Sequence, residues 1–318
     1  MRLKPPKTRK TAVLAVGGNA LAPSGRSDPT DQAEGARQVA AQAVAMCTGG
    51  GGVLVVHGNG PQVGGLALAQ EAVARELPMQ PLFTLGAMTQ GQLGYALAQA
   101  IGDAQVAVGG ERRVAAIATQ VVVSADDPGF SNPTKPIGPF FPEGRAHRLA
   151  EARGWSVAED SGRGWRRVVA SPEPVEIVEA DQIRMLLDGG NVVIACGGGG
   201  VPVVYDGATL TGVEAVIDKD YAAALVARLV GASTLLLVTG VDRVALDFGT
   251  PTQRDVEQMT IVEARGHLAD GQFPPGSMGP KVDAAVRYVE AGGGTAIICS
   301  LEQSALALEG RAGTRIVP

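Results

Sequence analysis

The sequence predicts an α/β protein of three layers, in which a mostly parallel central sheet lies between helices and carries a small inserted subdomain. Short apolar segments of strand length alternate with segments whose apolar residues recur at helical spacing. Three of the strand-like segments, at residues 12–16, 53–57 and 192–196, run directly into glycine. Gly and Ala are abundant and aromatic residues make up only 4% of the chain, which is typical of helices packed closely on a sheet.

The first half of the chain alternates strands and helices. Apolar segments at 12–16, 53–56 and 114–123 have the composition of strands. A helical stretch leading to Met46 separates the first two, and two further helices are predicted over 62–77 and 89–101. This order is that of parallel crossovers, so we expect a parallel sheet covered on both faces.

A change of composition marks a predicted insertion at about residues 126–174. Seven prolines and both tryptophans, Trp155 and Trp165, gather there. The segment 132–139 contains too many prolines for a helix or a central strand, so we expect a rigid, extended lid. A surface excursion without function remains the alternative.

The second half resumes the alternation. Helices are predicted over 179–187, from Lys219 onward, and over 282–291, with strands at 192–196, 234–238 and 295–299. Asp218 stands where an N-cap would accept the first amides of the helix that begins at Lys219. The whole chain, 1–318, is therefore expected to form one domain with one insertion.

Composition and charge exclude several classes of protein. A net charge of −5 without a long basic stretch gives little support for nucleic-acid binding. The apolar runs are far shorter than the roughly 20 residues that a membrane helix requires. The three cysteines, Cys47, Cys196 and Cys299, are far apart in apolar sequence and read as reduced core residues, so we expect a cytoplasmic protein.

The glycine loops after the three strands are candidate phosphate sites. Glycine allows backbone N–H groups to approach phosphate oxygens, and a following helix start adds partial positive charge. Each loop by itself is equally well explained as a tight strand-to-helix turn. Three of them in one chain favour a polyphosphate site.

Two lysines stand at predicted helix starts, where a cation is unfavourable for the helix dipole. Lys219 and Lys281 therefore indicate function, because a bound phosphoryl group would make both positions favourable. There is no G-x-x-x-x-G-K-[ST] motif and no protein-kinase H-R-D or D-F-G set. His57, at a strand end, is interpreted as a structural residue. No histidine occurs in a sequence pattern typical of a hydrolase catalytic triad.

Seven motifs, taken in order, closely resemble the carbamate kinase family of the amino-acid kinase superfamily. The resemblance extends over residues 12–317, and the motifs at 132–135, 162–166 and 216–220 are the most specific. The motifs are Gly17-Gly-Asn19, His57-Gly-Asn-Gly-Pro-Gln-Val-Gly64, Asn132-Pro-Thr-Lys-Pro-Ile-Gly-Pro139, Gly162-Arg-Gly-Trp-Arg166, Gly197-Gly-Gly-Gly-Val-Pro202, Gly212-Val-Glu-Ala-Val-Ile-Asp-Lys-Asp220 and Pro275-Gly-Ser-Met-Gly-Pro-Lys281.

The resemblance implies the amino-acid kinase fold and a phosphotransferase that catalyses ATP + carbamate = ADP + carbamoyl phosphate. It implies Mg²⁺ as cofactor, a homodimer, and a reaction run toward ATP in carbamoyl phosphate catabolism such as arginine fermentation. The N-terminal half would bind the carbamate and phosphoryl end, and the C-terminal half the nucleotide. Asp218 and Asp220 are the carboxylates that could help to hold Mg²⁺.

The resemblance also implies residue roles. Lys219 and Lys281 would flank the phosphoryl group, Asp218 would orient the lysines, and Lys135 on the lid would reach the carbamate. The phosphoryl and carbamate groups would be held by Gly17, Gly18, Asn19, Gly58, Asn59, Gly60, Gly198 and Gly199. The nucleotide pocket would be lined by Thr239, Gly240, Val241, Asp242 and Met278.

Three alternatives remain at this point. A kinase of the same superfamily for another small acid would share the glycine loops but would not need Lys135. A regulator of this fold that binds nucleotide without turnover would not need the lysines. A dinucleotide-binding protein is disfavoured, because the glycine that should complete G-x-G-x-x-G after Gly58 falls one residue late, at Gly64.

Overall fold

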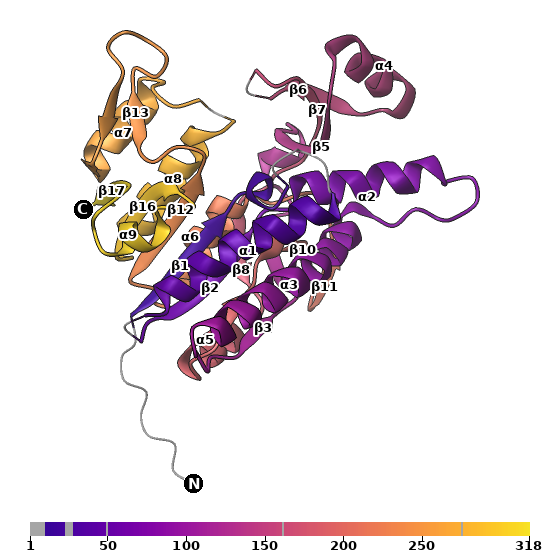
Figure 1. Ribbon diagram of the computed structural model, residues 1–318. Coiled ribbons are helices and arrows are strands. Elements are labelled where there is room, and N and C mark those ends of the chain that lie inside the picture. The colour runs from indigo at the N-terminus through magenta and orange to yellow at the C-terminus, as the bar shows by residue number, and fades with distance from the viewer. Residues whose placement is uncertain (1–9, 23–27, 49, 161, 275) are drawn as a thin grey trace.

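An eight-stranded sheet forms the centre of the computed structural model, which describes residues 10–22, 28–48, 50–160, 162–274 and 276–318 (Figure 1). All neighbouring strands pair in parallel except β16 and β17, which are antiparallel. The prediction of a mostly parallel central sheet is thus confirmed. In spatial order the strands are β15 (Gln258–Thr260), β17 (Thr314–Val317), β16 (Thr295–Ser300), β12 (Thr234–Thr239), β1 (Thr11–Val16), β2 (Gly52–His57), β9 (Val192–Ile194) and β3 (Val114–Ala116).

Helices cover both faces of this sheet, as expected. Alternate residues of β1 point to opposite faces, so Leu14 and Val13 belong to two different apolar clusters. Leu14 packs in the cluster that contains residues of α1 (Pro29–Met46), α3 (Leu82–Ala107) and α9 (Ser304–Leu308). Val13 packs in the cluster that contains residues of α5 (Ala180–Asp188), α6 (Lys219–Leu229), α7 (Ile261–Ala269) and α8 (Met278–Glu290). No helix among the described residues is both long and apolar enough to cross a membrane.

The single strand predicted over 114–123 was wrong, because the chain changes sheets within it. β3 closes one edge of the central sheet, whereas β4 (Gln120–Val123) joins a second sheet. Between them, the side chain of Gln90 accepts from the Thr119 backbone N–H at 2.7 Å and donates to the Thr119 carbonyl at 3.1 Å. At Thr119, the side chain of Gln90 therefore makes the two backbone hydrogen bonds that a neighbouring strand would otherwise make. The second sheet has the order β11 (Thr209–Gly212), β10 (Val201–Asp206), β4 and β8 (Pro174–Ile177).

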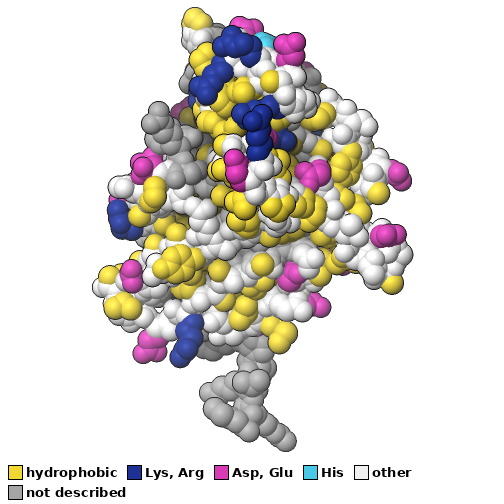
Figure 2. Space-filling view, turned by 90° about the vertical axis from the view of Figure 1, so that its right-hand side faces the viewer, with side chains coloured by type: hydrophobic (Ala, Val, Ile, Leu, Met, Phe, Trp, Pro, Cys, Tyr) yellow, Lys and Arg dark blue, Asp and Glu magenta, His cyan; other side chains and the backbone are white. Residues whose placement is uncertain are grey.

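Within the predicted insertion, residues 135–169 form a small subdomain that stands clear of the central sheet (Figure 1). It contains the antiparallel sheet β5 (Lys135–Phe141), β7 (Trp165–Val169) and β6 (Ser156–Glu159), together with α4 (Glu143–Arg153). We call residues 135–169 the protruding subdomain. Residues 135–139 of the proline-rich segment lie in the edge strand β5, so this part is extended as expected. Figure 2 shows Lys and Arg side chains gathered on this part of the molecule.

The protruding subdomain rests on α2 (Gly60–Ala72), which is shorter than the helix predicted over 62–77. Glu71 at the end of α2 binds Arg153 at 2.6 Å, Trp155 Nε1 at 3.2 Å and Arg167 at 3.2 Å. At the other end of the contact, the backbones of Gly64 and Gly138 approach so closely that a methyl group on Gly64 would overlap the Gly138 nitrogen. α2 therefore connects the subdomain to the body.

We predict that Gly64→Ala destabilises the protein by about 1–3 kcal/mol, because the added methyl must separate α2 from β5. Thermal unfolding is the measurement. Gly266→Ala in α7 is the matched control, since a methyl there meets nothing within 4 Å and replaces a helical glycine, which stabilises by roughly 0.5–1 kcal/mol. A Gly64→Ala protein that unfolds at the wild-type temperature would contradict the close contact.

Candidate active site

A cavity of about 700 Å³ opens where the parallel strands of the central sheet end. β1, β2, β12 and β16 all point their carboxyl ends to this edge, and the residues that follow them line the cavity. β2, the next strand in sequence, pairs with β1 on one side. β12, which comes much later in the sequence, pairs with β1 on the other side. Such a point of reversal in a parallel sheet is where ligands bind in α/β proteins.

Two of the three glycine loops lie side by side in the cavity wall. Gly58 donates its N–H to the carbonyl of Val16 at 2.8 Å, and a Cβ on Gly58 would lie 2.6 Å from the Gly18 nitrogen. Gly17, Gly18, Gly58 and Gly60 all line the cavity. The side chain of Asn19 lies outside the described residues.

The third loop is only partly in the cavity. Gly198, with φ +67°, lines it beside the side chain of Asn59. Gly199 does not line it, and a Cβ at this position would overlap the carbonyl oxygen of Ile217. For Gly199 the packing explanation therefore holds.

Asn59 and His57 are buried residues of the second glycine loop and its strand. Asn59 lines the cavity but is buried, and it donates Nδ2–H to Thr89 Oγ1 at 2.8 Å. His57 is 1% exposed, and its Nδ1 lies 3.1 Å from the Gly58 carbonyl. Burial lowers the pKa of His57 to about 4, so the ring is neutral at physiological pH. Its place is that of a structural residue.

Helix α6 places Lys219 at the cavity. Asp218 is the N-cap of this helix, as predicted, and its Oδ1 accepts the N–H of Asp220 at 2.9 Å. Lys219 is therefore the first helical residue, and Asp220 stands in the first turn, where a carboxylate is favourable for the helix dipole. The other oxygen of Asp218, Oδ2, binds Lys135 Nζ of the protruding subdomain at 2.7 Å.

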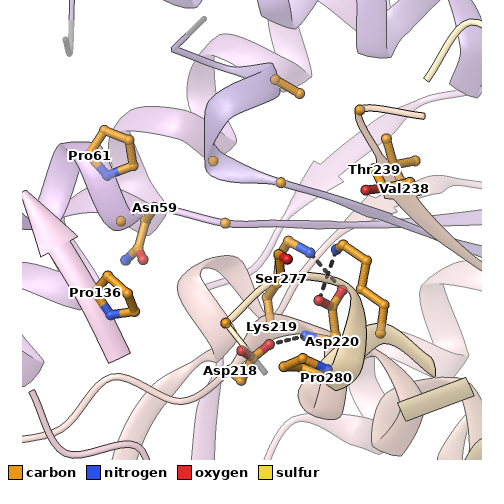
Figure 3. Close-up of a pocket in the computed structure, with 18 of the residues that line it drawn as sticks. Asn59, Pro61, Pro136, Asp218, Lys219, Asp220, Val238, Thr239, Ser277 and Pro280 are labelled. Atoms are coloured by element: carbon orange, nitrogen blue, oxygen red, sulfur yellow. Dashed lines mark hydrogen bonds and ion pairs between the residues drawn. The ribbon is translucent and has the colours of Figure 1, made fainter. Parts of the chain in front are cut away.

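α8 begins at Met278 and not after Lys281, so Lys281 lies inside the first turn. Pro280 is compatible with that turn, because the first N–H groups of a helix have no intrahelical partner. From there Lys281 Nζ reaches Asp220 Oδ2 at 3.0 Å, while Lys219 Nζ binds Asp220 Oδ1 at 2.6 Å (Figure 3). One carboxylate thus holds two ammonium groups from two helices.

Burial and charge set the protonation of this cluster. Burial opposes the charged form of Asp220, but Lys219 and Lys281 together hold the pKa of its carboxyl well below the usual range. Burial lowers the pKa of Lys219 to about 8, against the pull of Asp220 and with the help of the Lys281 charge. Burial also opposes the charge of Lys281, but Asp220 raises the pKa of that group above its usual value.

The predicted nucleotide residues divide into two groups. Thr239 and Gly240 line the cavity, whereas Val241, Asp242 and Met278 do not. Val241 is exposed, Asp242 accepts a hydrogen bond from Ser300 Oγ at 2.6 Å, and Met278 packs against the apolar core.

Sequence reasoning missed several residues of the cavity. The role of Asp220 as the shared partner of both lysines depends on α8, which is far away in sequence. The signal for Arg166 was its place in the Gly-Arg-Gly-Trp-Arg motif, to which no role was given. Other lining residues that were not predicted include Gln38, Asp160, Arg163, Ser277, Pro280, Ser300 and Glu302.

Comparisons with known proteins agree with this geometry. The sequence model of the Amino acid kinase family matches residues 10–300. Carbamate kinase of Pyrococcus furiosus is 45% identical over 97% of this chain and 99% of its own length. Carbamate kinase-like protein YahI of Escherichia coli is 43% identical over 97% and 99%. The structure of carbamate kinase from Giardia lamblia bound to citric acid superposes with a TM-score of 0.92 at 38% identity, over 98% of this chain and 99% of that chain.

The chain therefore belongs to the amino acid kinase family, and within it to the group of carbamate kinases and carbamate kinase-like proteins.

Proposed function

We propose that this kinase transfers a phosphoryl group reversibly between ATP and carbamate, giving ADP and carbamoyl phosphate. The observation that carries the proposal is the convergence of Lys219, Lys281 and Lys135 on two neighbouring carboxylates in one cavity lined by glycine. The relatives named as carbamate kinases support the choice of substrate.

The reaction requires little covalent chemistry from the protein. Carbamate is already an anion, so its oxygen needs no general base to attack or leave phosphorus. Lys219 and Lys281 would neutralise the charge on the phosphoryl oxygens in transit. Because Asp220 holds both ammonium groups before substrate binds, they need no reorganisation in the transition state.

We assign the two halves of the chain to the two substrates. Val238 and Thr239, from the C-terminal half, lie on one side of Lys219, and Asn59, Pro61 and Pro136, from the N-terminal half, lie on the other (Figure 3). The nucleotide would occupy the first side, and the carbamoyl group the second. The phosphoryl group would pass between them, beside Lys219.

We further propose that Mg²⁺ arrives on the nucleotide. Asp218 and Asp220 are the carboxylates nearest to the lysines, and each is already paired with an ammonium group. Among the described residues no group of three or more His, Cys, Asp or Glu could hold a metal. This donor set fits an ion held mainly by phosphate oxygens and water, which Mg²⁺ accepts. Bound there, Mg²⁺ would neutralise charge on the nucleotide phosphates.

Three further assignments rest on the family. We propose a homodimer, which the exposed apolar side chains of Met88, Tyr95 and Val106 on α3 support. We propose a cytoplasmic enzyme, which the three buried, unpaired cysteines support. We also propose ATP formation in carbamoyl phosphate catabolism as the physiological direction, as in arginine fermentation.

The experiment that tests the function is ATP formation from carbamoyl phosphate, ADP and Mg²⁺, with N-acetylglutamate and uridylate reactions run beside it. We expect ATP from carbamoyl phosphate alone. Activity on another acceptor would make the protein a kinase for a different small acid. ADP binding without turnover on any substrate would make it a regulator.

We predict that Lys219→Ala lowers kcat by roughly 10²- to 10³-fold, the usual effect of losing one preorganised charge partner. Steady-state ATP formation measures it. Lys10→Ala is the control, because Lys10 is exposed and precedes β1, at the opposite edge of the sheet. A wild-type kcat in Lys219→Ala would remove Lys219 from the mechanism.

We predict that Lys135→Ala raises the KM for carbamoyl phosphate more than the KM for ADP. The reason is that Lys135 enters the cavity from the protruding subdomain, next to Pro136, which lies across Lys219 from Thr239 (Figure 3). The two constants are measured by varying each substrate against saturating amounts of the other. An equal rise in both would contradict the assignment of Lys135 to the carbamoyl side.

We predict that kcat/KM for carbamoyl phosphate falls above about pH 8, where Lys219 of the free enzyme loses its proton. Asp220→Asn should move this fall to lower pH, because the Asp220 charge raises the pKa of Lys219. A pH profile of both proteins is the measurement. A fall that stays at the same pH in Asp220→Asn would show that another group titrates.

A further inference from the structure

A hydrogen bond joins α6 to α8 directly beside the lysine cluster. The hydroxyl of Tyr221 on α6 donates to Asp283 Oδ2 on α8 at 3.0 Å. Tyr221 is the residue after Asp220, and Asp283 is two residues after Lys281. The two helices are therefore linked twice in succession, first by the ion pair of Asp220 with Lys281 and then by this hydrogen bond.

The first turns of α6 and α8 meet against an electrostatic penalty (Figure 3). Each carries a lysine, which places a cation at the positive end of a helix dipole. The two ammonium groups also repel each other, and Asp220, the carboxylate that they share, has only one negative charge. A separation of the two helix starts would change the distance between the charges of Lys219 and Lys281. The hydrogen bond between Tyr221 and Asp283 opposes that separation.

Arg287, one turn after Asp283, holds both members of this pair in place. Its Nε binds Asp283 Oδ2 at 2.8 Å, and its Cζ lies 4.7 Å from the centre of the Tyr221 ring. Its Nη1 and Nη2 donate to the two carboxylate oxygens of Glu173 at 2.9 and 3.0 Å. The Asp283 carboxylate therefore cannot turn away from Tyr221 without losing a charged partner.

The Tyr221 hydroxyl keeps its proton at physiological pH. Burial raises the pKa of Tyr221 above its ordinary value, and the Asp283 carboxylate raises it further. A hydroxyl that donates to a carboxylate makes a stronger hydrogen bond than one between two neutral groups. The contact between α6 and α8 is of this stronger kind.

We propose that Tyr221 and Asp283 are positioning residues, which hold α6 and α8 at the separation that sets Lys219 and Lys281 around the phosphoryl group; this rests on the function proposed above. The cavity lining, among the described residues, includes neither of the two, so they act through the lysines. A displacement of about 1 Å between reacting groups and their partners costs up to roughly 10²-fold in rate. The loss of this link therefore lowers kcat and leaves both KM values nearly unchanged.

A link that only stabilises the fold is the competing explanation. It would lower the free energy of unfolding and leave the kcat of the folded molecules unchanged. The effect of a positioning link depends on Lys281, because without that side chain the separation of α6 and α8 no longer sets the distance between two charges. The two explanations therefore differ in whether the loss of the hydroxyl and the loss of Lys281 combine additively.

The first measurement is kcat for ATP formation in Tyr221→Phe, which removes the hydroxyl and keeps the ring beside Arg287. We expect kcat to fall roughly tenfold, while the KM values for ADP and carbamoyl phosphate stay within about threefold. Two controls lose a comparable contact elsewhere and should keep the wild-type kcat. Tyr205→Phe removes the contact of a hydroxyl with Glu176 on the exposed surface, and Arg265→Gln removes a link between α7 and the other end of α8.

The second measurement repeats Tyr221→Phe in a Lys281→Ala protein. If the hydroxyl acts by positioning Lys281, its removal should change kcat by less than about twofold in this background. Asp283 gives a further pair of variants, which serves as an independent test should Tyr221→Phe not fold. Asp283→Asn keeps an oxygen that can accept the hydroxyl, so it should lose less kcat than Asp283→Ala.

Thermal unfolding of each variant establishes that the assayed protein is folded. The inference is overturned if Tyr221→Phe keeps a wild-type kcat, if it loses the same factor with and without Lys281, if Arg265→Gln loses as much, or if Asp283→Asn loses as much as Asp283→Ala. Wild-type protein that forms no ATP from carbamoyl phosphate would remove the proposed function, and the inference with it. ATP formation by wild type together with additive losses would remove the inference alone.

Discussion

The sharing of Asp220 by two lysines is the interaction on which the site depends. Both oxygens of the carboxylate are used, at 2.6 Å by Lys219 and at 3.0 Å by Lys281. Two ammonium groups placed together in a buried site would repel each other and lose their hydration. One carboxylate between them offsets part of that cost. The cluster retains a positive charge and attracts a phosphoryl group.

The parallel sheet makes this cluster possible. Because β1, β2, β12 and β16 run in the same direction, the loops and helices that follow them meet at one edge. α6 and α8 pack against the same face of the sheet and bring their first turns together there. The glycines after β1 and β2 leave the space in front of those turns open. Fold and site therefore follow from the same strand order.

α2 couples the protruding subdomain to this edge. Its first turn faces the cavity at Gly60, and its last turn holds three side chains of the subdomain through Glu71. The contact of Gly64 with Gly138 fixes the two segments in between. Lys135 and Arg166 are thereby held over the cavity from outside the central sheet.

Local chemistry in the sequence determined the alternation of strands and helices, the glycine loops, and the N-cap of Asp218, because each depends on residues a few positions apart. Residues distant in sequence decided the rest. Gln90 ended β3 by binding Thr119, Ile217 turned Gly199 into a packing residue, and α8 brought Lys281 to Asp220. The hydrogen bond of Tyr221 with Asp283 forms only where α6 and α8 pack together. Such contacts join segments that only the folded chain places side by side, so no local pattern contains them.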